Sequence, residues 1–350
     1  MSLVDFLSKQ FIFKKSKQHE NSRRVGMKLT RRQFFELGGC LLGAAIIPRE
    51  SYANAKKYAT LIDITRCDGC QGEEIPLCVK ACREENKQRF PNPKKPILPY
   101  WPRKNYEDWS DKKELITTLT PYNWIFVQKV EVEGKTLYLP RRCMHCDSPP
   151  CVKGCPFGAL TRQPEGNSVI DHNLCFGGAK CRDVCPWHIP QRQAGVGLYL
   201  KLLPKYAGGG VMYKCDLCDS RIKKGEIPAC VIACKNQVFY FGERKEVYQM
   251  AYERAKKEGL YIYGDKQNGG TSTLYLSPVP FERIDQYLVQ TKARFRMPVN
   301  IPNRYHQEIN PIGKGMVATA VLSSLAGIAG ALINRSQDDS KQKEVDRDEE

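Results

Sequence analysis

The chain has 350 residues, with 55 Lys and Arg against 38 Asp and Glu, which gives a formal net charge of +17 at pH 7. With 27% charged and 41% hydrophobic residues, the composition excludes a disordered chain and a polytopic membrane protein, and the length fits one large or two ordinary domains. The 16 cysteines are too few for a disulfide miniprotein and far more than a cytosolic core needs.

The N-terminal segment, residues 1–55, has the pattern of an export signal. Its basic start ends in Arg31 and Arg32, which two phenylalanines, an apolar run over 37–47 and a small-x-small sequence follow. This order predicts a cleaved twin-arginine signal peptide, and thus export to the periplasmic side of a protein already folded around its cofactors. Two alternatives are an uncleaved anchor, for which the apolar run is short, and lipidation of Cys40, after which the apolar run continues.

Strand patterns and one helix pattern lie in the central region, residues 56–300. Five strand segments are expected, at 58–65, in a hairpin of 124–132 with 136–139, at 168–171 and at 238–241. Residues 243–258 have an amphipathic helical pattern that ends at Gly259. The long segment between Cys82 and Cys143 is rich in Pro, Trp, Tyr and charged residues, which suits a docking surface or a solvated loop equally.

Fifteen cysteines in this region form four groups of related spacing. The groups are Cys67-x2-Cys70-x7-Cys78-x3-Cys82, Cys143-x2-Cys146-x4-Cys151-x3-Cys155, Cys175-x5-Cys181-x3-Cys185 and Cys215-x2-Cys218-x11-Cys230-x3-Cys234. Each varies the C-x2-C-x2-C-x3-C-P run of [4Fe–4S] ferredoxins, in which the fourth cysteine serves another cluster. An odd number of serial cysteines fits disulfides badly, and the spacing is not that of a zinc finger or ribbon. The pattern therefore favours iron–sulfur clusters.

The third group lacks one ligand, because Gly178 stands where the spacing expects its second cysteine. The cluster there is expected to be [3Fe–4S], or a fourth [4Fe–4S] cluster with a ligand other than cysteine. His145 lies between Cys143 and Cys146, and it either tunes the cluster that these two cysteines bind or has a merely structural role. No arrangement for a nucleophile, a nucleotide or a nucleic acid stands out, so no catalytic residue is predicted.

An uncharged stretch of 18 residues, 316–333, closes the sequence before a hydrophilic tail. As a helix it would be about 27 Å long, just enough to cross a bilayer core, so a transmembrane anchor is expected and a buried core helix is the alternative. The expected domain division is signal 1–55, iron–sulfur domain 56–300, linker 301–315, transmembrane helix 316–333 and cytoplasmic tail 334–350.

Small residues recur every four positions along this stretch, at Ser323, Gly327 and Ala331. Such a stripe lets another helix approach closely. The stretch has no histidine or charged residue, so any quinone chemistry would belong to a partner subunit.

From about Thr30 to Arg335 the sequence resembles the four-cluster, ferredoxin-type electron-transfer subunits of exported respiratory oxidoreductases. Within these it is most similar to the membrane-anchored iron–sulfur subunit of hydrogenase-2-type [NiFe] hydrogenases. The residues that carry the resemblance are Thr30-Arg31-Arg32, Cys143-Met144-His145-Cys146, Lys214-Cys215-Asp216-Leu217-Cys218, Val279-Pro280-Phe281-Glu282 and Lys314-Gly315-Met316. The seven-residue gap before Cys78, Lys235 after Cys234, and Gly178 depart from the family pattern.

The resemblance implies an α+β fold of two ferredoxin-like modules in tandem, with long loop insertions and the C-terminal helix. It also implies that the groups exchange their fourth cysteines. The implied ligand sets are the Cys67 set (Cys67, Cys70, Cys78, Cys234), the Cys143 set (Cys143, Cys146, Cys151, Cys185), the Cys175 set (Cys175, Cys181, Cys155) and the Cys215 set (Cys215, Cys218, Cys230, Cys82).

The family further implies a non-catalytic role in anaerobic respiration. Electrons would pass through three [4Fe–4S] clusters and one [3Fe–4S] cluster between a periplasmic catalytic subunit, expected to be a [NiFe] hydrogenase, and a quinone-reactive membrane subunit. The alternatives are the corresponding subunit of a molybdopterin enzyme, such as formate dehydrogenase or a polysulfide or sulfoxide reductase, and a redox-silent metal-stabilised scaffold.

Overall fold

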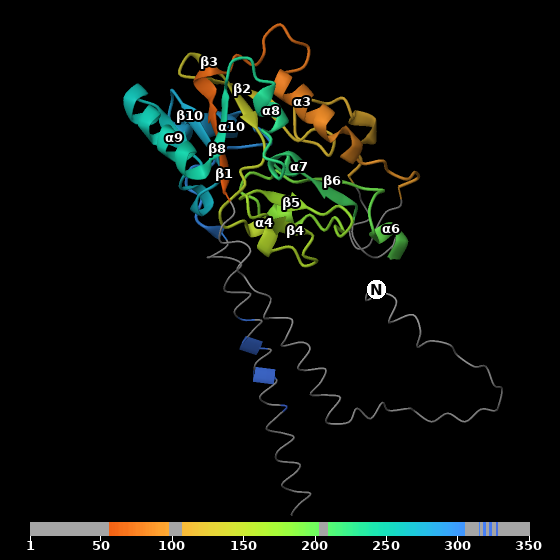
Figure 1. The fold of residues 1–350 in the computed structure, drawn as a ribbon. Helices are drawn as coiled ribbons and strands as arrows, with labels where there is room; N and C mark the ends of the chain where they lie inside the picture. The colour runs from red at the N-terminus through yellow and green to blue at the C-terminus, as the bar shows by residue number, and fades with distance from the viewer. Residues whose placement is uncertain are drawn as a thin grey trace, which may run out of the picture. The chain divides into compact units, whose positions relative to one another are not determined.

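A four-stranded sheet joins the two ends of the described chain. The computed structural model describes residues 56–97, 107–202 and 209–304, and the single positions 315, 318, 319, 322, 323 and 327 (Figure 1). The sheet has the order β8-β1-β10-β9, formed by β8 (Phe239–Glu243), β1 (Tyr58–Asp63), β10 (Thr273–Ser277) and β9 (Tyr261–Tyr263). The β1 strand is parallel to β10 and antiparallel to β8, and β9 is antiparallel to β10.

Helix α9 (Arg244–Glu258) covers one face of this sheet (Figure 1). Because strand side chains alternate between faces, Leu61 and Leu274 pack with Val247 of the helix in a small core of their own. Ile62, next along β1, belongs instead to the large core that contains the cysteines. The helix ends at Gly259, whose φ of +66° is the left-handed conformation of a C-terminal cap.

Three two-stranded hairpins make up the other sheets. They are β2 (Phe126–Val132) with β3 (Lys135–Arg141), β4 (Leu160–Arg162) with β5 (Ser168–Ile170), and β6 (Gln191–Gln193) with β7 (Val211–Tyr213). The first has a two-residue turn in which Glu133 and Gly134 both have positive φ, at +53° and +72°. This turn matches the right-handed twist of the strands on either side.

The remaining helices are mostly a single turn. The longer two are α3 (Leu77–Asn86) and α10 (Phe281–Gln290), and the short ones are α4 (Pro150–Lys153), α5 (Lys180–Asp183), α6 (Tyr199–Leu202), α7 (Asp219–Ile222) and α8 (Ala229–Ile232). Four 3-10 turns are η2 (Ile64–Arg66), η3 (Lys87–Arg89), η4 (Ser110–Lys112) and η5 (Gln267–Gly269). Helices α3 and α8 lie side by side although they come from distant parts of the chain (Figure 1).

The five elements expected from sequence periodicity are all present, with ends that differ by at most two residues. They are β1, the β2–β3 hairpin, β5, β8 and α9. Sequence analysis did not identify β4, β6, β7, β9, β10 or the helices other than α9. Most of these are three or four residues long, so they contain too few positions for a period to be recognised.

The predicted transmembrane anchor is wrong as a feature of the fold and of the protein's localisation. Within the described ranges no helix is both long and apolar enough to cross a membrane. The longest of these helices, α9, has 15 residues, which is too short to cross a bilayer core at 1.5 Å per residue. Much of its surface is also polar. Most of 316–333 lies outside the described residues, as do the signal residues Arg31 and Arg32, the tail 334–350 and Ala331.

Candidate metal centres

All four cysteine groups share one local construction. The last cysteine but one of each group is the second residue of a helix, namely Cys78 of α3, Cys151 of α4, Cys181 of α5 and Cys230 of α8. The last cysteine of each group follows four residues later, about one turn on. A helix start leaves backbone N–H groups without partners, and these groups favour nearby negative charge such as a thiolate.

Strand pairing brings the groups together. Strand β1 leads into the first group and pairs with β8, which follows the last group. Strand β4, which follows the second group, pairs in the same way with β5, which leads into the third. The inner pair of groups is therefore nested within the outer pair along the chain.

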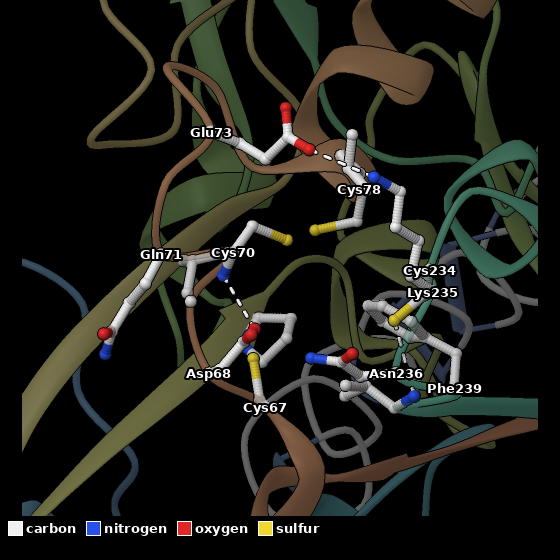
Figure 2. Close-up of a pocket in the computed structure, with 15 residues that line it drawn as sticks. Cys67, Asp68, Cys70, Gln71, Glu73, Cys78, Cys234, Lys235, Asn236 and Phe239 are labelled. Atoms are coloured by element: carbon white, nitrogen blue, oxygen red, sulfur yellow. Dashed lines mark hydrogen bonds and ion pairs between the residues drawn. The ribbon is translucent and has the colours of Figure 1, made fainter.

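The Cys67 set surrounds a single cavity of about 190 Å³. Figure 2 shows the sulfurs of Cys67, Cys70, Cys78 and Cys234 facing this cavity from two distant parts of the chain. The backbone N–H of Val238 donates to Cys234 Sγ at 3.4 Å. Burial raises the pKa of the Cys67 thiol to about 12, with the charges of Cys234 and Cys70 adding to the rise.

The Cys175 set lines a second cavity of about 160 Å³, together with mostly apolar residues and Gly178. Its three cysteines come from both inner groups, and Met212 N–H donates to Cys175 Sγ at 3.4 Å. Gly178 is exposed, and beside it the exposed Phe157 stacks on Phe176 with ring centroids 4.6 Å apart. The described residues around this cavity include no other cysteine.

The members of the Cys143 set lie close enough for their charges to raise one another's pKa. Burial raises the pKa of the Cys146 thiol well above its ordinary value, and the charges of the other three members of the set add to this. Burial likewise raises the pKa of Cys151 to about 12 and that of Cys185 to about 11, again with contributions from the same set.

The Cys215 set is the most buried of the four, because all of its cysteines are buried. Burial raises the pKa of the Cys82 thiol well above its ordinary value, and the charges of Cys215, Cys230 and Cys218 raise it further. Leu217 N–H donates to Cys215 Sγ at 3.4 Å, and Asn86 Nδ2 donates to Cys82 Sγ at 3.7 Å.

Interactions between sets place them in a row. After burial, the charge of Cys230 contributes most to the raised pKa of Cys78, so the Cys67 set lies next to the Cys215 set. Burial raises the pKa of Cys215 and the charge of Cys143 adds to the rise, so the Cys215 set lies next to the Cys143 set. Burial raises the pKa of Cys181 and the charges of Cys151 and Cys185 add to the rise, so the Cys143 set lies next to the Cys175 set. The order is thus Cys67 set, Cys215 set, Cys143 set, Cys175 set.

Buried donors lie between the two middle sets. His145 is buried, and its Nδ1 accepts from Ser168 N–H at 3.2 Å. Burial lowers the pKa of His145 well below its ordinary value, and Lys214, Arg142 and Arg162 lower it further, so the ring is neutral. The proton is therefore on Nε2, which lies 3.7 Å from Cys215 Sγ and can donate to it.

His145 thus contacts a cysteine of a different set from its sequence neighbours Cys143 and Cys146. Lys214 and Arg142, which sequence analysis did not identify as site residues, complete the same region. The Lys214 ammonium donates to the backbone oxygens of Ser168 and Cys215. A signal existed, because a basic residue stands directly before the first cysteine of three groups, namely Arg66, Arg142 and Lys214.

Arg142 provides a test of whether the Cys215 set suits a cluster. Its guanidinium is buried, Nη1 donates to Cys215 Sγ at 3.8 Å, and Nε and Nη2 have no protein partner. Buried donors are rarely left unpaired, so an anionic group beside Cys215 would satisfy them. Within the described chain no group of three or more His, Cys, Asp or Glu side chains is arranged to hold a single metal ion.

The remaining predicted positions carry less information. Ser323 and Gly327 are exposed, and Ser323 Oγ donates to Thr319 O at 2.9 Å. Their predicted role in helix packing depended on the membrane span, which the structure does not support.

Two domain families, each described as a 4Fe-4S dicluster domain, match residues 66–159 and 134–244. The chain is 30% identical over 197 residues to the probable anaerobic dimethyl sulfoxide reductase chain YnfG of Escherichia coli K12, covering 55% of this chain and 77% of that protein. The chain belongs to the family of iron–sulfur subunits built from 4Fe-4S dicluster domains.

Two further relatives extend the comparison. The hydrogenase-2 operon protein HybA of Escherichia coli O157:H7 is 29% identical over 308 residues, covering 73% of this chain and 83% of that protein. A protein of Nitratidesulfovibrio vulgaris is 31% identical over 230 residues, covering 64% of this chain, and this chain spans only 55% of its length. This iron–sulfur subunit therefore binds iron–sulfur clusters and functions in electron transfer.

Proposed function

We propose that this iron–sulfur subunit is non-catalytic and carries electrons along four clusters between a catalytic subunit and a quinone-reactive membrane subunit. Three [4Fe–4S] clusters would bind at the Cys67, Cys215 and Cys143 sets, and a [3Fe–4S] cluster at the Cys175 set. The bound clusters supply the one-electron chemistry, and the protein supplies thiolates, buried donors and spacing.

The observation that carries this proposal is the row of four sets with both ends near the surface. At one end, Cys67, Cys70 and Cys234 are half-buried. At the other, the cavity of the Cys175 set is bordered by exposed Phe157 and Gly178. The most buried set lies inside the row. Such an arrangement suits entry of electrons at one end and exit at the other.

The similarity to HybA favours a [NiFe] hydrogenase as the catalytic partner. A second candidate is a molybdopterin oxidoreductase, which the similarity to a dimethyl sulfoxide reductase chain favours. The export signal at Arg31 and Arg32 stays a prediction from sequence.

Metal and acid-labile sulfide analysis of the anaerobically purified chain tests the proposal. We expect about 15 iron atoms per chain and no zinc. Zinc in place of iron, or iron without labile sulfide, would support the redox-silent scaffold. Nickel or molybdenum in the complex purified from its native cells would identify the partner.

A further inference from the structure

A buried positive charge without a negative partner lies beside the Cys215 set. Arg142 follows β3 and is only 1% exposed. Its nearest recorded contact is Cys215 Sγ, and no carboxylate pairs with it among the described residues. Two of its nitrogens, Nε and Nη2, have no protein partner.

This charge would be costly if nothing balanced it. A buried ion without a counterion is strongly destabilising, and a buried guanidinium is never deprotonated. Burial opposes the charged form, but the negative charges of Cys215 and Cys230 outweigh it and raise the pKa of Arg142. The thiolates of this set are therefore the groups that most favour the guanidinium charge, ahead of the Tyr275 phenol.

The Cys215 set is also where added negative charge is hardest to accommodate. Thiolate ligands give a cluster net negative charge, and reduction adds another. All four cysteines of this set are buried, so solvent does little to stabilise the reduced state. An internal cluster that resisted reduction would block a row in which every electron must pass through it.

We propose that Arg142 raises the reduction potential of the cluster at the Cys215 set and so keeps this internal step of the row open. This inference rests on the proposed function. Arg142 is a positioning and charge-balancing residue, because it acts on the electron carrier through the thiolate of Cys215.

The neighbouring Arg141 provides a matched control. It is buried to a similar extent, but its guanidinium has different hydrogen-bond partners. Its guanidinium donates to Gln128 Oε1 at 2.9 Å and to Arg296 O at 2.7 Å, and it contacts no cysteine. Replacing Arg141 removes the same charge one residue away without removing a donor from the Cys215 set.

The experiment is an EPR-monitored redox titration of the full-length protein and its variants Arg142→Gln, Arg142→Met, Arg142→Lys and Arg141→Gln. In the two neutral Arg142 variants we expect the midpoint potential of one [4Fe–4S] cluster to fall. The [3Fe–4S] signal serves as an internal reference and should not shift. Arg142→Lys, which keeps the charge on a more compact head, should fall less, and Arg141→Gln should match the wild type.

Unchanged potentials in a neutral variant with full iron content overturn the inference, as does an equal shift in Arg141→Gln. If both neutral variants lose this cluster, Arg142→Lys decides, and an unchanged or higher potential overturns the inference. A wild-type chain without iron and sulfide would instead refute the proposed function, so the two failures are distinct.

Discussion

Gly178 leaves room for a side chain but offers no ligand. No heavy atom lies within 4 Å of the position that a Cβ would take there, and its φ is not in the left-handed region. Its neighbour Gly177 is different, with φ of +66° and the backbone of Gly210 directly against it. The missing ligand in the Cys175 set is therefore a property of side-chain chemistry at one position, which substitution can restore.

Gly178→Cys should convert the proposed [3Fe–4S] cluster into a [4Fe–4S] cluster, because a thiolate becomes available at the expected spacing. The EPR signal of the oxidised protein should disappear, and the iron content should rise by about one atom per chain. Gly178→Ala is the control, since it fills the same space without a ligand and should keep the signal. A signal that persists in Gly178→Cys, or that the wild type lacks, would contradict the assignment.

His172 should make the stability of the fold depend on pH. It packs against Tyr213 and Trp124, with ring centroids 4.4 and 6.3 Å away. Burial lowers the pKa of His172 to about 4, and Arg89 lowers it further, against the opposing charge of Asp216. The unfolded chain has a histidine pKa of about 6.5, so between these values the unfolded state binds more protons.

The stabilisation from neutral His172 is thus complete above pH 6.5 and is lost as the pH falls towards 4. We expect a loss of about 2 kcal/mol between pH 7 and pH 5, and a shallower dependence in His172→Phe. Thermal unfolding of the holo protein at both pH values measures this. Equal pH dependence in the two proteins would show that His172 does not titrate in this way.

At the scale of elements, α9 is tied to the strand that leads into the first cysteine group. Asp63, the last residue of β1, is 3% exposed at its side chain and accepts from Thr65 N–H at 3.0 Å, which caps η2. Arg254 of α9 pairs with Asp63 at 2.8 Å, and Arg66 pairs with it at 3.2 Å. The helix therefore helps to hold the segment on which Cys67 is presented.

Arg254→Met should destabilise the protein by about 1–3 kcal/mol, because it leaves a buried carboxylate with one partner fewer. Arg283→Met is the control, since Arg283 and Glu133 are both more than half exposed and 3.7 Å apart. That change should cost less than about 0.5 kcal/mol. Anaerobic denaturant unfolding of both variants gives the comparison, and equal losses would contradict the role of Asp63.

Over the whole molecule, sequence predicts chemistry better than connectivity. The cysteine spacing is local, so the ligand groups and the glycine in the third group are evident without a structure. Helix α10 was missed although Pro280 precedes it and its buried Phe281, Ile284 and Leu288 recur at helical spacing. The contact of His145 with Cys215 joins residues 70 positions apart, and no local pattern contains it. The membrane span predicted at 316–333 is not supported, because no helix among the described residues is both long and apolar enough to cross a membrane.

The molecule also divides into parts that depend differently on their clusters. The sheet formed by β8, β1, β10 and β9 has a core with α9 that contains no cysteine. Between β3 and β8, by contrast, the elements are three or four residues long, and eleven of the cysteines lie there. Such short elements are marginal alone and depend on tertiary anchoring.

Removal of the clusters should therefore loosen residues 142–238 before the sheet. Folding and metal binding are coupled where cysteines ligate a metal. Without clusters, cavities such as those lined by the Cys67 and Cys175 sets would stay unfilled, which destabilises the loops around them. Hydrogen exchange of the holo protein and of the anaerobically chelated protein measures this, with β1 and α9 as the internal control. We expect amide protection to fall by at least about tenfold in 142–238 and much less in β1 and α9, as for local rather than global opening. A uniform loss across both parts would mean that the sheet has no stability of its own, and no loss would mean that protein packing alone holds the cysteine loops.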